Sequence, residues 1–87
     1  MQQLDERILE HLSEEGWSTP HIMAKEPAFH DLEASKARIG ERCRALADVD
    51  FIAPIHGDMY EITTWGQLYL DGDLDADNQA PRRSVLG

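Results

Sequence analysis

The feature that most constrains the fold of this chain is a tight turn, His56-Gly57-Asp58, between two short runs of strand-forming residues. Phe51 to Ile55 (FIAPI) precedes the turn and Met59 to Ile62 (MYEI) follows it. Glycine readily adopts the positive φ that such a turn requires, so the pattern predicts a two-stranded antiparallel hairpin. Pro54 has no backbone N–H and limits its strand to an edge or a short pairing. With 87 residues in all, the hairpin is expected to belong to one small domain.

A first helix is predicted from Leu4 to Ser13, because its apolar residues recur at helical spacing. The residues expected to face the core are Leu4, Ile8, Leu9 and Leu12. The charged residues expected to face solvent are Asp5, Glu6 and Glu10. Gly16 ends this helix, and Trp17 opens a short extended link.

Capping residues mark the starts of two further helices. Thr19 followed by Pro20 predicts a second helix from Pro20 to Lys25, with Ile22 and Met23 inward. A third helix that ends near Ala47 can begin at Asp31 or at Ser35, and Ser35 is favoured as its cap. The buried stripe of that helix is Ile39, Cys43 and Leu46. The connection over 26–34 is long, and its stretch from Pro27 to Ala34 is predicted to be irregular, with Phe29 and Leu32 reaching the core.

The last predicted helix runs from Trp65 to Leu70 and is capped by Thr63 or Thr64. The order helix, helix, helix, β-hairpin, helix is that of a winged helix-turn-helix, an α+β fold that is mainly α. We therefore expect a winged-helix domain over residues 1–72. Residues 73–87 are acidic and poor in apolar side chains, so they are predicted to form a disordered tail.

The basic residues are concentrated in the third predicted helix. The nine residues from Lys36 to Arg44 (KARIGERCR) hold four of the eight Lys and Arg residues. The segment from Glu33 to Ala47 holds four basic and two acidic residues, for a net charge of +2. Because the whole chain has a formal charge of −9, the remaining residues carry −11. A locally positive helix on an anionic body indicates a nucleic-acid reader.

A helical wheel places small residues and charges together on the exposed side of this helix. Small residues let a helix approach base edges closely, and arginine can bind guanine through two hydrogen bonds. Arg38 and Arg44 are the candidates for base contacts. Lys36 and Arg42 lie at the boundary of the buried side and are the candidates for phosphate contacts. Ser35 can donate to a phosphate at the helix N-terminus.

Two further candidates are ambiguous. Glu41 can accept a hydrogen bond from cytosine N4, or it can pair with Arg38 or Arg44 and align them. His56, at the hairpin tip, can donate to a phosphate or enter a minor groove, but it can equally be an exposed turn histidine. The alternative for the whole helix is an exposed face of mixed solubilising charges.

The overall composition is acidic, with 17 Asp and Glu residues against eight Lys and Arg. A dispersed acidic coat with few lysines is typical of proteins kept soluble in concentrated salt, which predicts a halophilic source; an ordinary acidic domain of a mesophile is the alternative. At about 1 M salt the Debye length is about 3 Å, so distant acidic residues would repel DNA weakly.

Other classes of site and function lack support in the sequence. The apolar runs are too short to span a membrane, and the N-terminal residues do not resemble a signal peptide, so we expect a cytoplasmic protein. Cys43 is the single cysteine, and the four histidines lack metal-ligand spacing, so no metal site is predicted. Without a phosphate loop or a catalytic constellation, we expect no enzyme activity, no cofactor and no small-molecule ligand.

A small core is often helped by a partner chain, so a homodimer is expected. The first and last helices offer more apolar surface than the core needs. The residues expected at this interface are Leu4, Trp65, Leu68 and Tyr69.

Four segments carry a resemblance to a known family: LDERILEHL, STPHIMA, S-x-x-x-I-x-x-R-C-R-x-L-A from Ser35 to Ala47, and MYEITTWGQLYLDGDLDA from Met59. They are similar to the small haloarchaeal winged-helix proteins related to the phage φH repressor. The resemblance implies a transcriptional regulator or repressor that binds double-stranded DNA through its third helix, commonly as a dimer. The chain departs from the family pattern in two places. The 26–34 connection is longer than in a compact helix-turn-helix, which would splay the third helix or offer Phe29 and His30 as contacts. Position 38 is an arginine where such proteins often have an aromatic or polar residue.

The sequence thus predicts a sequence-specific DNA-binding regulator that reads the major groove with residues 35–47. The alternative is a winged-helix adapter that binds other proteins and leaves DNA alone. A continuous positive strip along the third helix favours the first, and a strip neutralised by neighbouring acids favours the second.

Overall fold

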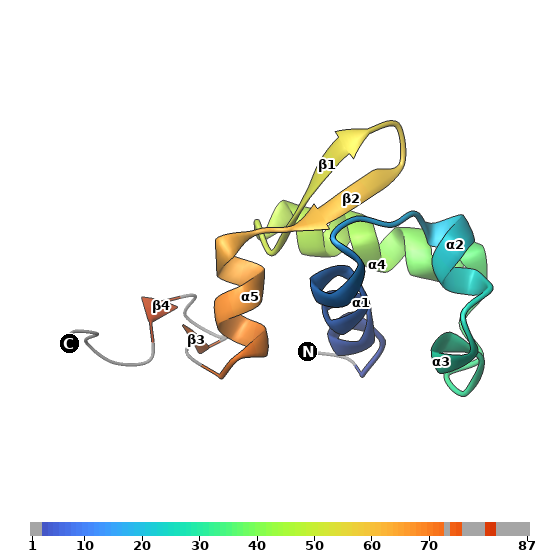
Figure 1. Cartoon of the computed structure of the whole chain (residues 1–87), viewed down its shortest axis with the longest axis horizontal. Coiled ribbons are helices and arrows are strands. Elements are labelled where there is room, and N and C mark those ends of the chain that lie inside the picture. Colours follow the sequence, from blue (N-terminus) through green and yellow to red (C-terminus); the bar gives the residue numbers. More distant parts are fainter. Residues whose placement is uncertain (1–2, 73, 76–79, 82–87) are drawn as a thin grey trace.

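The computed structural model of the chain describes residues 3–72, 74–75 and 80–81 (Figure 1). Its helices are α1 (Gln3–Glu15), α2 (Pro20–Ala24), α3 (Pro27–His30), α4 (Lys36–Asp48) and α5 (Thr64–Leu70). Its strands are β1 (Ile52–His56), β2 (Met59–Ile62), β3 (Leu74–Asp75) and β4 (Ala80–Pro81). The predicted order of three helices, hairpin and helix is confirmed, and the fold is a winged helix with one additional short helix, α3.

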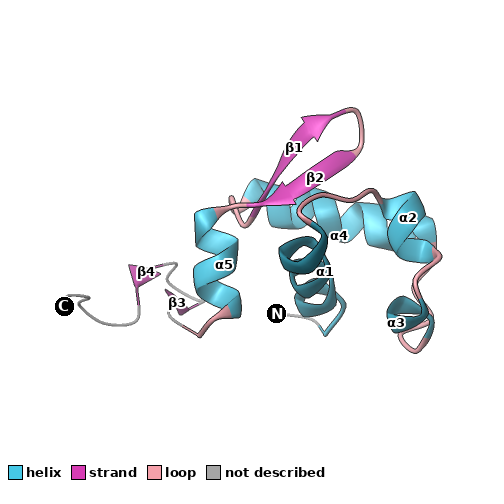
Figure 2. Ribbon diagram, in the orientation of Figure 1, coloured by secondary structure: helices cyan, strands magenta, loops and turns pink. Residues whose placement is uncertain are grey.

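The hairpin of β1 and β2 is the wing of the fold, and it stands on one side of the helices (Figure 2). Ile52 lies opposite Ile62, and a bulge interrupts the register between Pro54 and His56. The link between α1 and α2 pairs with the hairpin through an isolated antiparallel β-bridge. Ser18 exchanges backbone hydrogen bonds of 3.0 and 2.9 Å with Tyr60 on β2. The wing is therefore anchored to the α1–α2 link as well as to α4.

The core lies where α1, α4 and the base of the hairpin meet. Its fully or nearly fully buried apolar residues are Leu4, Ile8, Leu9, Leu12, Met23, Phe29, Ile39, Cys43, Leu46, Phe51 and Ile52. Both predicted helical stripes belong to this set, so the periodicity of α1 and α4 identified their inward faces correctly.

The connection between α2 and α4 is more regular than we predicted. Pro27 occupies the first turn of α3, where its missing N–H costs nothing, and the helix ends at His30. Phe29 is 1% exposed and meets the ring of His11 edge to face at 5.7 Å. Phe29 therefore belongs to the core, as expected from the sequence, and is not available as an extra contact. His30 is exposed.

Two orientation predictions were wrong. Asp5, expected in solvent, is buried on α1, and Ile22, expected in the core, is 38% exposed on α2. Met23, and not Ile22, is the fully buried residue of α2 in the core, and Ala24 packs against the core beside it. Leu32 is partly buried against the core.

A capping residue and a glycine hold α5 against Asp50 and Phe51, which connect α4 to β1. Thr63 accepts a hydrogen bond from the N–H of Gly66 through its hydroxyl oxygen, and the same hydroxyl donates to the carbonyl of Asp50. A Cβ at Gly66 would lie 2.1 Å from the carbonyl oxygen of Phe51, so only glycine fits there. Tyr69, one turn later, stacks on Phe51 at 5.4 Å.

The predicted tail, residues 73–87, falls mostly outside the described residues. Within it, β3 and β4 pair antiparallel, with Leu74 opposite Pro81.

Candidate nucleic-acid interface

Helix α4 is positioned by both its cap and its buried face. The hydroxyl oxygen of Ser35 accepts a hydrogen bond of 3.1 Å from the N–H of Arg38, which starts the helix at the residue expected from the sequence. Ile39, Cys43 and Leu46 are at most 2% exposed and pack toward α1 and the hairpin. The opposite side of α4 is therefore turned outward in a fixed rotation.

That outward side forms one wall of a shallow groove of about 490 Å³ between the start of α2 and the tip of the wing. The residues that line it are Pro20, Lys36, Ala37, Gly40, Glu41, Arg44 and Asp58. Ala37 and Gly40 have no long side chains, so the backbone of α4 lies close to the surface of the groove here. A Cβ at Gly40 would be 3.7 Å from Arg44 Nη1, so the arginine lies across the glycine. We call this surface the α4 groove.

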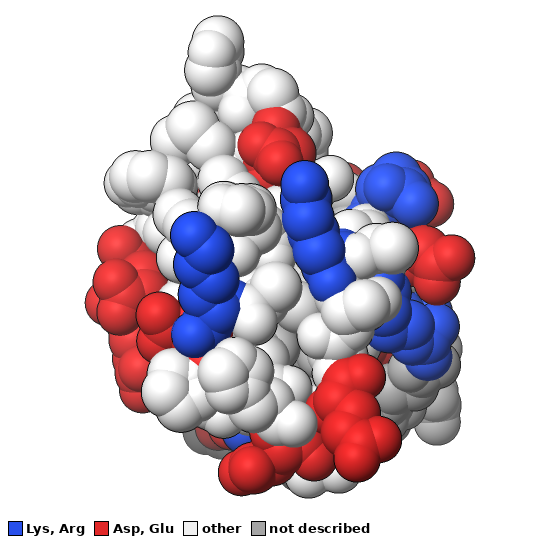
Figure 3. Space-filling view, turned by 90° about the vertical axis from the view of Figure 1, so that its right-hand side faces the viewer, with Lys and Arg blue, Asp and Glu red and all other residues white. Residues whose placement is uncertain are grey.

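The charges along the α4 groove are mixed. Lys36 and Arg44 are exposed, and they form no ion pair within the described part of the chain. Arg38 and Glu41 pair with each other at 3.5 Å, which is one of the two roles expected for Glu41. With side chains 47% and 61% exposed, this is a weak surface pair that another partner can exchange. Figure 3 shows basic side chains separated by neutral and acidic ones on the side that holds α2 and α3.

Arg42 has a different role from the one expected. Its Nε and Nη2 donate to both carboxylate oxygens of Asp5, each at 2.8 Å. These hydrogen bonds, more than the neighbouring charges, raise the pKa of the Arg42 guanidinium, while burial opposes them. Arg42 thus joins α4 to α1. A guanidinium that a buried carboxylate holds through both Nε and Nη2 is poorly placed to contact phosphate.

The wing contributes less positive charge than winged domains often show. His56 ends β1, lies opposite Met59 and is exposed. Asp58, in the turn, reaches the α4 groove and adds a carboxylate to it. The sequence analysis named the turn that holds Asp58 but not its place in the groove.

Cys43 lies inside the core. Burial raises the pKa of the Cys43 thiol to about 12, so this cysteine is a core residue and not a nucleophile. No group of metal-ligating side chains comes together among the described residues. None of the helices in the described ranges is long and apolar enough to cross a membrane.

The residues expected at a dimer interface occupy two different environments. Leu4 is 7% exposed and belongs to the core, so it offers little surface to a second copy. Leu68 and Tyr69 are half-buried against the core, and the hydroxyl of Tyr69 donates to Glu6 at 2.9 Å. Trp65 is 39% exposed at the start of α5.

Comparison with solved structures places this arrangement in a family. The crystal structure of the PhiH1 repressor-like protein from Haloarcula marismortui is 36% identical and superposes with a TM-score of 0.80. The match covers 87% of this chain and 83% of that one.

The chain belongs to the PhiH1 repressor-like family.

The assignment agrees with the resemblance noted in the sequence. No protein-family model and no curated protein sequence matches the chain. Because the structural match covers 87% of the chain, the fold of that PhiH1 repressor-like protein extends over most of the sequence.

Sequence reasoning missed Asp5, although a signal for it was present. Asp5 stands four residues before Leu9 and seven before Leu12, so it shares their helical stripe. Arg42 lies between Ile39 and Leu46 in the same way, at the edge of the α4 stripe. A carboxylate and a guanidinium on the buried margins of two packed helices are expected to pair.

Proposed function

We propose that this PhiH1 repressor-like protein is a sequence-specific DNA-binding transcriptional regulator that acts as a repressor. Helix α4 enters the major groove, and the wing contacts the adjacent backbone. The observation that carries the proposal is the α4 groove, where Lys36 and Arg44 flank a low surface made by Ala37 and Gly40. Helices that read bases combine such small residues with long basic ones.

The proposed contacts follow from the environment of each side chain. Arg44 and Arg38 contact bases. Arg38 does so after its ion pair with Glu41 breaks and its guanidinium turns to the DNA. Lys36 binds phosphate, and the hydroxyl of Ser35, at the N-terminus of α4, donates to a neighbouring phosphate. Glu41 accepts from cytosine once Arg38 has turned to the DNA, and His56 approaches the backbone from the wing. Arg42 is left out of this set because Asp5 holds it.

The setting proposed for this activity is the cytoplasm of a salt-rich cell. The formal charge of −9 would oppose DNA binding in dilute buffer. At about 1 M salt, screening shortens the range of this repulsion to about 3 Å. Counterion release then contributes little, so short hydrogen bonds and shape must provide most of the affinity.

We further propose that the regulator binds as a homodimer. Trp65 is the exposed apolar residue among those predicted for the interface, with Leu68 and Tyr69 beside it on α5. A dimer mass by light scattering in molar KCl that falls to a monomer mass in Trp65→Ser supports this. A monomer mass for the unaltered protein at about 100 μM contradicts it, since regulatory dimers hold at that concentration.

Fluorescence anisotropy with a mixed-sequence DNA duplex tests DNA binding itself. Lys36→Ala/Arg44→Ala is expected to weaken binding at least tenfold and to reduce the slope of log K against log salt by about 1, for the phosphate contact of Lys36 that is lost. Lys25→Ala, which removes an exposed charge outside the α4 groove, is the control. Equal affinities for both variants and the unaltered protein would contradict the proposal.

One set of observations favours the alternative, a protein–protein adapter. The basic residues of α4 do not form a continuous strip, because Arg42 is bound by Asp5, Arg38 is paired with Glu41, and Asp58 lines the same groove as Arg44. An adapter would show no DNA affinity at any salt concentration in the anisotropy assay.

A further inference from the structure

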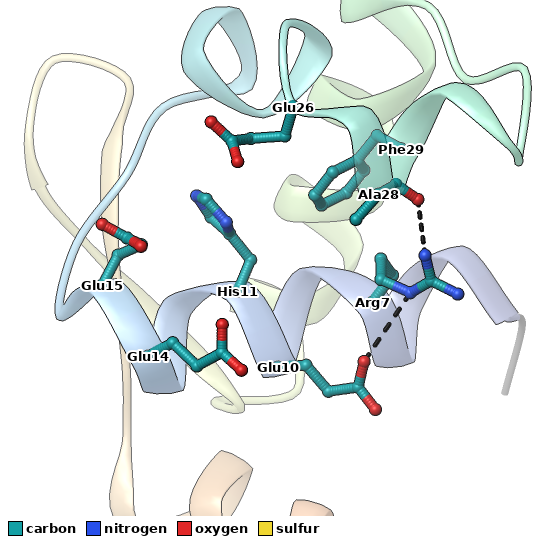
Figure 4. A pocket seen from close by; sticks show the side chains of 8 residues that line it. All are labelled: Arg7, Glu10, His11, Glu14, Glu15, Glu26, Ala28 and Phe29. Atoms are coloured by element: carbon teal, nitrogen blue, oxygen red, sulfur yellow. Dashed lines mark hydrogen bonds and ion pairs between the residues drawn. The ribbon is translucent and has the colours of Figure 1, made fainter.

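A second concave surface lies away from the α4 groove, between α1, the α1–α2 link and α3. It consists of two adjoining hollows of about 320 and 200 Å³, which share His11, Glu15 and Glu26. Figure 4 shows the side chains that line the larger one. No residue that lines either hollow also lines the α4 groove. We call the two hollows together the α1 groove.

The floor of the α1 groove is held rigid by internal contacts. His11 projects from α1, its Nε2 lies 2.9 Å from the hydroxyl of Ser18, and its ring meets Phe29. Ser18 is itself tied to β2 through the backbone of Tyr60. A fixed floor lowers the entropy that a bound segment would otherwise have to offset.

Two large apolar side chains stand open at one end of the α1 groove. Trp17 is 47% exposed and Ile22 is 38% exposed, and both line the smaller hollow. Single exposed apolar residues are ordinary, but here a tryptophan and an isoleucine share one depression beside a buried phenylalanine. Tryptophan is among the residues that most often dominate the energy of protein interfaces.

The walls of the α1 groove are acidic. Glu10, Glu14, Glu15 and Glu26 line it, and Figure 4 shows them around His11. Among the described residues, Arg7 is the one Lys or Arg that lines the groove, and it pairs with Glu10 at 3.6 Å and donates to the carbonyl of Ala28. Within the described residues, no Lys or Arg pairs with Glu14, Glu15 or Glu26.

From this geometry we propose that the α1 groove binds a basic, amphipathic segment of a partner protein. An apolar side chain of the segment packs against Trp17 and Ile22, and its Lys or Arg residues pair with Glu14, Glu15 and Glu26. The partner is basic because the groove presents unpaired carboxylates on both sides of its apolar end. This inference does not rest on DNA binding, and because the two grooves share no residue, a partner can occupy one while DNA occupies the other.

A titration followed by nuclear magnetic resonance tests the proposal. The probe is an amphipathic peptide of about 18 residues, with Leu and Lys at helical spacing, and the comparison peptide has Glu in place of each Lys. The indole N–H of Trp17 reports on the groove, and that of Trp65, 39% exposed on α5, is an internal control. Trp17→Ser/Ile22→Ser removes the apolar end. Its matched control is Ile55→Ser/Val49→Ser, since Ile55 is 48% exposed, Val49 is 38% exposed, and neither lines the α1 groove.

The Lys peptide is expected to shift the signals of Trp17 and its neighbours, and the Glu peptide to leave them unchanged. The Kd should rise at least tenfold in Trp17→Ser/Ile22→Ser and stay within twofold in the matched control. Glu14→Gln/Glu15→Gln/Glu26→Gln should weaken binding strongly in 0.2 M KCl and much less in 2 M KCl, because salt screens the ion pairs.

Three results would overturn the proposal. They are no binding of the Lys peptide to the folded protein, an equal loss of affinity in the matched control variant, and a dimer of the chain itself that Trp17→Ser/Ile22→Ser dissociates. The last result would make a second copy the occupant of the groove.

Discussion

Asp5 and Arg42 form a partly buried ion pair, and replacing Arg42 should destabilise the fold more than replacing Asp5. The Asp5 side chain is 1% exposed and the Arg42 side chain 25% exposed, and two hydrogen bonds of 2.8 Å join them. Arg42→Met keeps most of the side-chain stem but leaves a buried carboxylate without its cation, which should cost about 3–5 kcal/mol of unfolding free energy. Asp5→Asn should cost less, about 1.5–3 kcal/mol, because the guanidinium can turn to water.

The double variant Asp5→Asn/Arg42→Met distinguishes buried charge from lost packing. It carries no buried charge, so it should be more stable than Arg42→Met alone. Urea unfolding followed by circular dichroism in molar KCl measures each free energy. Arg38→Met is the matched control, since its exposed pair with Glu41 should contribute no more than about 0.5 kcal/mol. If Arg42→Met and Arg38→Met lost equal stability, the reasoning would be refuted.

Three further predictions concern the core and α5. Gly66→Ala places a methyl group against the carbonyl oxygen of Phe51 and should cost about 2 kcal/mol or more in urea unfolding; a smaller loss than about 0.5 kcal/mol would contradict the packing. Cys43 should not react with a thiol reagent at pH 8 until urea unfolds the chain, because burial raises its pKa to about 12. Burial, and then the hydrogen bond to Glu6, raise the pKa of Tyr69 to about 12. The unfolded chain releases this proton first, so stability should fall as pH rises from about 10 to 12, and less so in Tyr69→Phe.

The fold could be predicted because its determinants are local. The caps at Thr19 and Ser35, the turn at Gly57 and the stripe of Ile39, Cys43 and Leu46 each act within a few residues. Where prediction failed, a contact between distant segments decided the outcome. Asp5 is buried because Arg42, 37 residues later, supplies its counter-charge.

The candidate site could be predicted only in part, for the same reason. Periodicity indicates that Arg44 lies on the outer side of α4 and that Lys36 lies at the boundary of its buried side, whereas in the fold both residues are exposed. It does not indicate that Asp58 reaches their groove, because this depends on how the wing is tilted over α4. The α1 groove was not foreseen at all, since α1, the link and α3 form it together.

Arg42 also changes how the charge of α4 is understood. Four basic residues in nine suggested a continuous strip along the helix. In the folded chain one of the four fixes the angle between α4 and α1, and another is shared with Glu41. We therefore expect specificity to depend on a few hydrogen bonds and little on net charge, which suits a protein acting in concentrated salt.

The most direct test of the central claim, that α4 reads DNA sequence, is selection of binding sites from a random DNA pool in molar KCl. The account predicts an enriched palindromic motif, because a homodimer presents two α4 helices related by symmetry. Arg38→Ala/Arg44→Ala should remain folded, since both residues are exposed, and should lose the motif. A folded protein that enriches no motif, or a double variant that enriches the same one, would contradict the claim.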